Sequence, residues 1–183
     1  MRNEQSEFRI RDSWHLSGKT NDVQEIDPKS LRKLTYGLFV LSSKDEKDNA
    51  CIVNTAVQVA SDPTKITVSV QKENLTGEII MKTGKFNVSV LTEKTPFELI
   101  KHFGMQSGRD VDKFKDYSDA ETSINGIKYI AKYTNAYFSA KVISTTDLGS
   151  HTLFVGEITE AKVLNDEPSC TYAYYHSDIK PKI

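Results

Sequence analysis

The chain has 183 residues, of which 38% are hydrophobic and 27% charged, and its formal net charge at pH 7 is -1. This length suits one domain with a substantial core, and the small net charge provides no overall field to attract nucleic acid or anionic lipid. No apolar run approaches the roughly 18 residues that span a bilayer, and the N-terminus lacks the apolar core of a secretory signal. We therefore expect a cytoplasmic protein with no nucleic-acid partner and no membrane segment.

Cysteine and histidine usage argues against a disulfide framework and a zinc site. The two cysteines, Cys51 and Cys170, are expected to be buried thiols. The four histidines are scattered, with no pair at helical spacing. The sequence predicts no metal site, and any site for an anion must be built from local groups.

Two regions differ in composition. Residues 1–25 are polar and show no clear period, so we expect an N-terminal arm that is either poorly ordered or docked on a partner subunit. The domain is expected to span residues 26–183. It opens with a short helix that Asp27 caps, with Leu31 and Leu34 on its apolar face.

Strands dominate the rest of the chain. Asn74 is predicted to cap a helix that stops at Gly84, and a capping box from Thr95 to Glu98 starts another that ends at Gly104. About six or seven strands without regular crossover helices favour a closed, mainly antiparallel β-barrel over a doubly wound sheet. The predicted strands are residues 36–43, 50–59, 66–70, 86–90, 136–144 and 151–164.

A first polar cluster lies within and after the predicted strand 50–59. If these amide and hydroxyl groups are buried, they need hydrogen-bond partners, which the rim of a flavin ring would supply. A plain edge strand is the alternative. The cluster consists of Asn54, Thr55, Gln58 and Ser61.

A second cluster follows the next strand. Lys72 provides a positive charge, Thr76 a hydroxyl, and the helix that begins at Asn74 provides backbone amides, as a phosphate group requires. Two such clusters, about one strand apart, favour a phosphorylated, ring-bearing ligand such as FMN. Alternatively, Lys72 is a solvated lysine and Asn74 only a helix cap.

Residues 105–126 form a polar excursion with a predicted short helix at 111–114. Arg109 could bind a phosphate through two parallel hydrogen bonds, or it could pair with Asp112 on a solvated loop. His151 begins the last long strand, where it could contact a nicotinamide or lie on the surface.

Several short segments, in the same order, resemble the flavin reductase-like domain of the FMN-binding split-barrel class, and in particular the flavin domain of high-molecular-weight rubredoxins and flavoredoxin. The likeness extends from residue 26 to the C-terminus. It implies a mainly β fold, a split β-barrel of Greek-key type with a few short α-helices. The segments are residues 34–40, 54–59, 72–76, 86–91, 103–110 and 172–175.

The resemblance also implies a site. It places FMN near the interface of a homodimer and His151 beside the nicotinamide, although Ser150 replaces the aspartate of the family's Gly-Asp-His turn. Lys72, Asn74 and Thr76 are assigned to the phosphate, and Ser61 and Arg109 are further cofactor-binding candidates. The residues assigned to the ring and ribityl chain are Asn54, Thr55, Gln58, Val59 and Ala60.

The function implied is an FMN-binding oxidoreductase of the flavin reductase type. NADH or NADPH would supply electrons, which pass through the flavin to a free flavin or an acceptor protein. No Cys-rich module follows residue 182, so a rubredoxin-like acceptor is expected on a separate chain. The alternatives are an FMN electron carrier without a nicotinamide site and a non-catalytic split-barrel binding protein.

Overall fold

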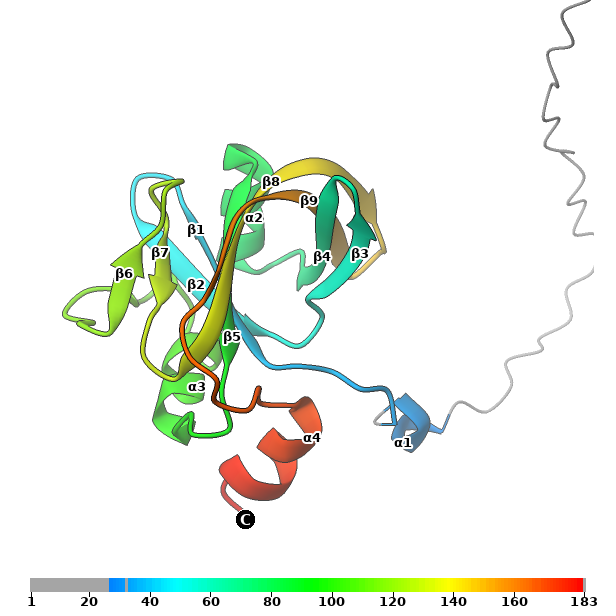
Figure 1. Cartoon of the computed structure of the whole chain (residues 1–183), viewed down its shortest axis with the longest axis vertical. Coiled ribbons are helices and arrows are strands. Elements are labelled where there is room, and N and C mark those ends of the chain that lie inside the picture. Colours follow the sequence, from blue (N-terminus) through cyan, green and yellow to red (C-terminus); the bar gives the residue numbers. More distant parts are fainter. Residues whose placement is uncertain (1–26, 32, 183) are drawn as a thin grey trace, which may run out of the picture.

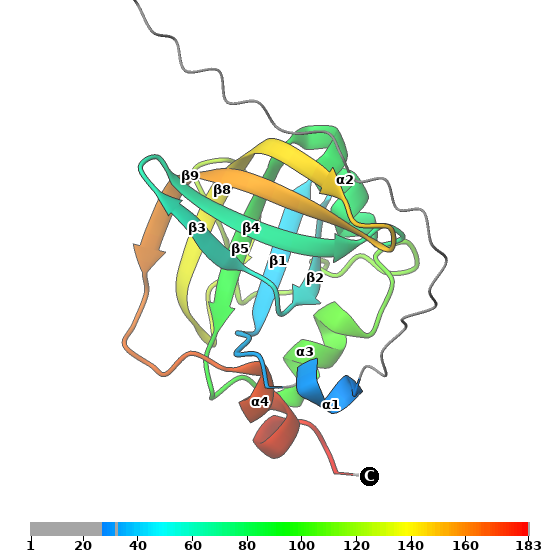
Figure 2. The ribbon, with the colours of Figure 1, turned by 90° about the vertical axis from the view of Figure 1, so that its right-hand side faces the viewer.

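The computed structural model describes residues 27–31 and 33–182, so the predicted arm at residues 1–25 lies outside the described residues. The described chain forms one antiparallel sheet of seven strands, in the order β2-β1-β5-β8-β9-β4-β3, which curls into a barrel (Figures 1 and 2). A two-stranded hairpin, β6-β7, lies outside it. The predicted mainly β barrel is confirmed. The strands are β1 Phe39–Lys44, β2 Asp48–Val53, β3 Val57–Ser61, β4 Thr64–Gln71, β5 Lys85–Leu91, β6 Ala120–Thr122, β7 Lys128–Ile130, β8 Thr134–Asp147 and β9 His151–Val163.

Short helices cover the two ends of the barrel. Helix α2 lies at one end, whereas α3 and α4 lie together at the other (Figures 1 and 2). Within the described ranges, no helix is long and apolar enough to cross a bilayer. The helices are α1 Pro28–Leu31, α2 Leu75–Thr83, α3 Phe97–Gly104 and α4 Tyr172–Tyr174, which continues into a π-helical turn at Tyr175–Ile179.

The central strands are apolar because the sheet is buried on both faces. In β1, the fully buried Val40 belongs to the cluster beneath α3, whereas its fully buried neighbour Leu41 belongs to the barrel interior. Successive side chains of a strand point to opposite faces of the sheet, so adjacent apolar residues pack into two different hydrophobic clusters. The interior cluster includes Val68, Ile80, Phe86, Val88 and Phe154.

The prediction of a single strand over residues 50–59 is wrong. β2 pairs with β1, whereas β3 pairs with β4, and the chain passes between the two at residues 54–56. The Thr55 hydroxyl donates to the Ser69 carbonyl at 3.1 Å and accepts from the Ser69 amide at 3.2 Å. Where the strand is interrupted, the Thr55 hydroxyl therefore takes the place of a neighbouring strand's backbone as the hydrogen-bond partner of Ser69.

The predicted helix α2 is confirmed at both ends. The Asn74 side chain accepts from the Thr76 amide at 2.9 Å, and Gly84 ends the helix in the left-handed conformation with φ of 68°. At the short helix α1, the Asp27 carboxylate accepts from the Lys29 amide as predicted, but Leu31 and Leu34 are exposed.

Two local predictions at the other helices are wrong. Pro96 is the N-cap of α3, and the Thr95 hydroxyl donates to the Tyr133 carbonyl instead of closing a capping box. Residues 111–114 form no helix, and a turn covers residues 113–116. The Asp112 carboxylate accepts from the Phe114 amide, and the Lys113 side chain turns into the protein.

Gly156 of β9 allows close packing in the barrel interior. A Cβ atom at this position would lie 2.7 Å from Phe86 Cζ and 3.0 Å from Ala140 Cβ. We expect Gly156→Ala to lower the free energy of unfolding by about 1–3 kcal/mol, because overpacking forces neighbours from their positions. In a double-mutant cycle measured by urea denaturation, Phe86→Leu should relieve part of this cost, and additive effects would contradict the contact.

Candidate functional site

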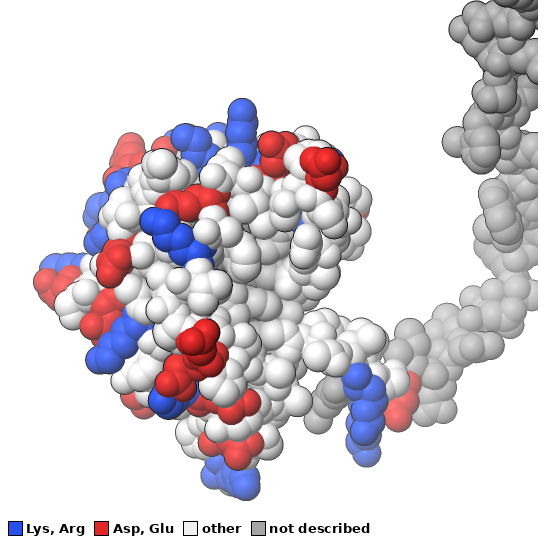
Figure 3. Space-filling model, in the orientation of Figure 1, with Lys and Arg blue, Asp and Glu red and all other residues white. Residues whose placement is uncertain are grey.

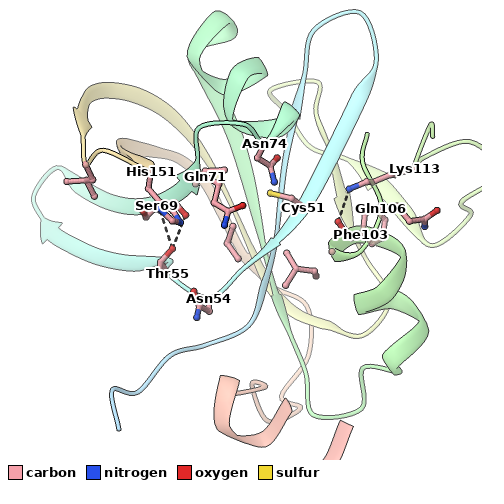
Figure 4. Close-up of a pocket in the computed structure, with 15 residues that line it drawn as sticks. Cys51, Asn54, Thr55, Ser69, Gln71, Asn74, Phe103, Gln106, Lys113 and His151 are labelled. Atoms are coloured by element: carbon pink, nitrogen blue, oxygen red, sulfur yellow. Dashed lines mark hydrogen bonds between the residues drawn. The ribbon is translucent and has the colours of Figure 1, made fainter. Parts of the chain in front are cut away.

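A cavity of about 470 Å³ opens where β2, the crossing segment at residues 54–56, the end of β4 and the end of α3 meet. On the face drawn in Figure 3, the surface is concave and mostly uncharged between the β3–β4 hairpin and the segment that leads to α1. Figure 4 shows a close-up of the cavity with its lining residues. Its lining residues are Cys51, Ile52, Val53, Asn54, Thr55, Ser69, Val70, Gln71, Asn74, Phe103, Gly104, Gln106, Lys113, Leu148 and His151.

The lining combines an apolar floor with amide side chains. Val53 and Val70 belong to the barrel interior, so their strands hold them rigidly. Asn54 and Gln71 supply amide groups on one side of the cavity, and Gln106 supplies another across it, beside Phe103 (Figure 4). Such a mixture of apolar surface and a few convergent polar groups is typical of cofactor sites.

Lys113 provides a buried positive charge at the cavity. Its side chain is only 3% exposed, and the ammonium donates to the carbonyls of Ala50 and Phe103, both at 2.8 Å. Among the described residues no carboxylate forms an ion pair with it. Burial lowers the pKa of Lys113, because the charged form loses its hydration.

The tip of the β8–β9 hairpin places Leu148 and His151 at the cavity. The tip is held from the end of β4: the Lys72 ammonium lies 2.7 Å from the Asp147 carboxylate, and the Lys72 amide donates to the Ser150 carbonyl at 3.1 Å. The hydrogen bond from Lys72 lowers the pKa of Asp147. The Ser150 hydroxyl lies 2.8 Å from His151 Nδ1 and so orients the imidazole.

Comparison with known families identifies the domain. The model of the flavin reductase like domain matches residues 31–182, which is most of the chain. This chain belongs to the flavin reductase-like family. The domain therefore extends over the barrel, the cavity and the C-terminal helical turns.

Two curated relatives of this flavin reductase-like domain are similar over most of its length. The high molecular weight rubredoxin of Moorella thermoacetica is 42% identical over 152 residues, covering 82% of this chain and 66% of that protein. The ferric-chelate reductase (NAD(P)H) of Archaeoglobus fulgidus is 38% identical over 153 residues, covering 82% of this chain and 89% of that protein. The chain thus spans slightly less than two thirds of the rubredoxin but most of the reductase.

Solved structures share the fold. An FMN-binding protein from Thermus thermophilus superposes with a TM-score of 0.69 at 20% identity, covering 80% of this chain and 81% of that one. The flavin reductase component of a bacterial two-component tryptophan halogenase gives a TM-score of 0.70 at 23% identity, covering 80% and 93%. The barrel is therefore the split barrel that the sequence predicted.

The structure brings four of the predicted site residues together. The cavity is lined by Asn54 and Thr55 of the crossing segment, by Asn74 at the start of α2 and by His151 at the start of β9, three segments that are far apart in the sequence. The β3 candidates do not line it, because β3 runs away from the cavity as an edge strand beside β4. They are Gln58, Val59, Ala60 and Ser61.

The remaining candidates lie apart from the cavity. Lys72 lines a separate hollow beside α2, and Thr76 is fully buried, where its hydroxyl accepts from the Asn49 amide group at 2.9 Å. Arg109 lines a third hollow and pairs with Glu78. The considered Arg109–Asp112 pair does not form; Lys47 lies 3.7 Å from the Asp112 carboxylate instead.

Sequence reasoning missed Ser69, Gln71, Gln106 and Lys113, which all line the cavity. Gln71 ends β4 directly before the predicted phosphate cluster, so the position at the strand end was an available signal. Lys113 lies in the polar excursion, but nothing in the sequence indicated that this lysine turns inward while Arg109 turns outward.

Thr55 closes the gap in the β3–β4 ladder at the edge of the cavity. We expect Thr55→Val to lower the free energy of unfolding by about 1–3 kcal/mol, because both backbone groups of Ser69 lose the Thr55 hydroxyl as their partner. Thr55→Ser keeps the hydroxyl and is the matched control. Urea denaturation measures both, and equal stability of the two variants would show that these bonds contribute nothing.

Proposed function

We propose that this protein is an FMN-binding, NAD(P)H-dependent oxidoreductase of the flavin reductase type. The observation that carries the proposal is the cavity of about 470 Å³, in which an apolar floor, amide side chains and one buried ammonium converge. The similarity to a ferric-chelate reductase (NAD(P)H) over 89% of that protein supports the same activity.

The residues present fit FMN. The isoalloxazine ring needs an apolar floor and hydrogen-bond donors and acceptors at its edge, which Val53, Val70 and the Asn54 and Gln71 amides supply. The phosphate needs a positive charge and donors, which the cavity offers near Asn74 at the start of α2. The predicted contributions of Gln58, Val59, Ala60, Ser61 and Arg109 stay proposals.

FMN, when bound, accepts a hydride from a reduced nicotinamide and passes electrons on singly or in pairs. The chain's own residues position and enclose it: the strands of the barrel hold the cavity floor, and Leu148 stands with His151 at the hairpin tip. We propose that the His151 imidazole, oriented by Ser150, contacts the nicotinamide. The electron acceptor is a free flavin or a rubredoxin-like protein.

A homodimer with FMN near the interface completes the proposal. β3 is an edge strand on which Val57 and Val59 are 56% and 53% exposed. α1 stands away from the barrel and exposes Leu31 (Figure 1). Exposed apolar side chains on an unpaired strand edge are typical of a surface that another subunit covers.

The absorbance spectrum of the purified protein tests the proposed function. We expect an absorbance spectrum with flavin bands, and we expect these bands to bleach within seconds when NADH or NADPH is added without oxygen. Bleaching by dithionite but by neither nicotinamide would favour the electron carrier without a nicotinamide site. A colourless protein that FMN does not reconstitute would overturn the proposal in favour of a non-catalytic barrel.

A substitution of His151 tests the proposed contact with the nicotinamide. We expect His151→Ala to raise the NAD(P)H concentration for half-maximal flavin reduction about tenfold, as the loss of one hydrogen bond requires. The FMN dissociation constant and reduction by dithionite should not change. Leu148→Ala, at the same hairpin tip, is the control for a loosened loop. An unchanged concentration dependence in His151→Ala would remove this histidine from the nicotinamide site.

A further inference from the structure

The buried ammonium of Lys113 has neutral partners only. Two backbone carbonyls, of Ala50 and Phe103, accept its hydrogen bonds, and an ammonium has three donors. Taking a charge out of water is costly unless an opposite charge compensates it. A lysine that is 3% exposed beside a cavity therefore favours an anion as the occupant of that cavity.

The location of Lys113 indicates which part of a ligand it meets. Cys51, Asn74 and Lys113 all line the cavity. Burial raises the pKa of the Cys51 thiol, and the Thr76 side chain, the Lys113 charge and the Asn74 side chain oppose this shift. The Lys113 and Asn74 side chains thus act on one thiol. In Figure 4, Lys113 and Asn74 lie on the Cys51 side of the cavity, while Ser69 and His151 lie on the opposite side.

Helix α2 adds to the positive potential at the same side. Its N-cap is Asn74, and the N-terminus of a helix carries a partial positive charge that favours anions. A buried ammonium and a helix N-terminus at one end of an otherwise uncharged cavity suit a phosphate group. The Asn54 and Gln71 amides and the hairpin tip lie toward the other end, where they can meet the ring.

Lys72, the residue that the sequence pattern favours for the phosphate, has a different environment. Its side chain is 43% exposed, and the Asp147 carboxylate at 2.7 Å already neutralises its charge. It lines the hollow beside α2 and does not line the cavity. To bind a ligand in the cavity, the Lys72 ammonium would have to leave the Asp147 carboxylate.

We propose that Lys113, and not Lys72, is the cation that binds the phosphate of the flavin mononucleotide, together with Asn74 at the start of α2. This assignment rests on the proposed function of the cavity. It makes Lys113 a specificity-determining residue, because the phosphate is what distinguishes FMN from riboflavin.

The test compares FMN and riboflavin as ligands of the same full-length protein. Dissociation constants are measured by flavin fluorescence for the wild type and for Lys113→Gln, Lys113→Arg and Lys72→Gln. We expect Lys113→Gln to weaken FMN binding about 10- to 100-fold, as the loss of a charged hydrogen bond requires, and to leave riboflavin binding unchanged. Lys113→Arg and Lys72→Gln should keep the preference for FMN.

Each other outcome decides against the assignment. Equal weakening of FMN and riboflavin in Lys113→Gln would place Lys113 at the ring. If only Lys72→Gln loses the preference for FMN over riboflavin, Lys72 and not Lys113 binds the phosphate. A wild-type protein that binds neither flavin would overturn the proposed function itself.

A measurement on variants that retain Lys113 covers the case in which Lys113→Gln does not fold. Inorganic phosphate, matched in ionic strength with sodium chloride, should displace FMN but not riboflavin from the wild type and from Lys72→Gln alike. Displacement that disappears in Lys72→Gln, or that affects riboflavin equally, would overturn the assignment.

Discussion

The crossing of the chain at residues 54–56 is the constraint on which the site depends. β2 and β3 follow each other in the sequence but pair with different strands, at opposite ends of the sheet order. The backbone cannot satisfy both partners at the crossing, and the Thr55 hydroxyl takes over the bonds to Ser69. The barrel is left open at this point, and the cavity lies in the opening.

The rigidity of the surrounding sheet gives this opening a defined chemistry. Because β1 and β5 contribute to both buried clusters, the sheet that also carries the cavity strands β2 and β4 cannot move without disturbing two cores. The polar side chains at the opening are thus attached to strands that are held in place by the packed sheet. The floor is apolar, amide groups line the wall, and the only charged side chain among the lining residues, apart from the titratable His151, is that of Lys113.

Much of the fold could be predicted because it follows from local chemistry. The Asn74 cap, the stop at Gly84 and the two long C-terminal strands depend on residues close in sequence. The errors lie where distant segments decide: the strand 50–59 divides because β1 and β4 compete for it as partners. The Thr95 hydroxyl bonds to Tyr133, 38 residues away, instead of capping its own helix.

The site shows the same division. By itself the sequence determined the family pattern, the barrel class and the segments that carry polar groups, since these depend on residue type, period and order along the chain. Only the tertiary structure decided which of those groups meet. It brought Asn54, Thr55, Asn74 and His151 to one cavity. The lysine that lines this cavity is Lys113, whereas Lys72, which the sequence pattern favoured, pairs with Asp147 outside it. The physical reason is that the burial of a charged side chain, and the group with which it pairs, depend on segments that are far apart in the sequence. The order of residues along the chain does not show which of these segments come into contact.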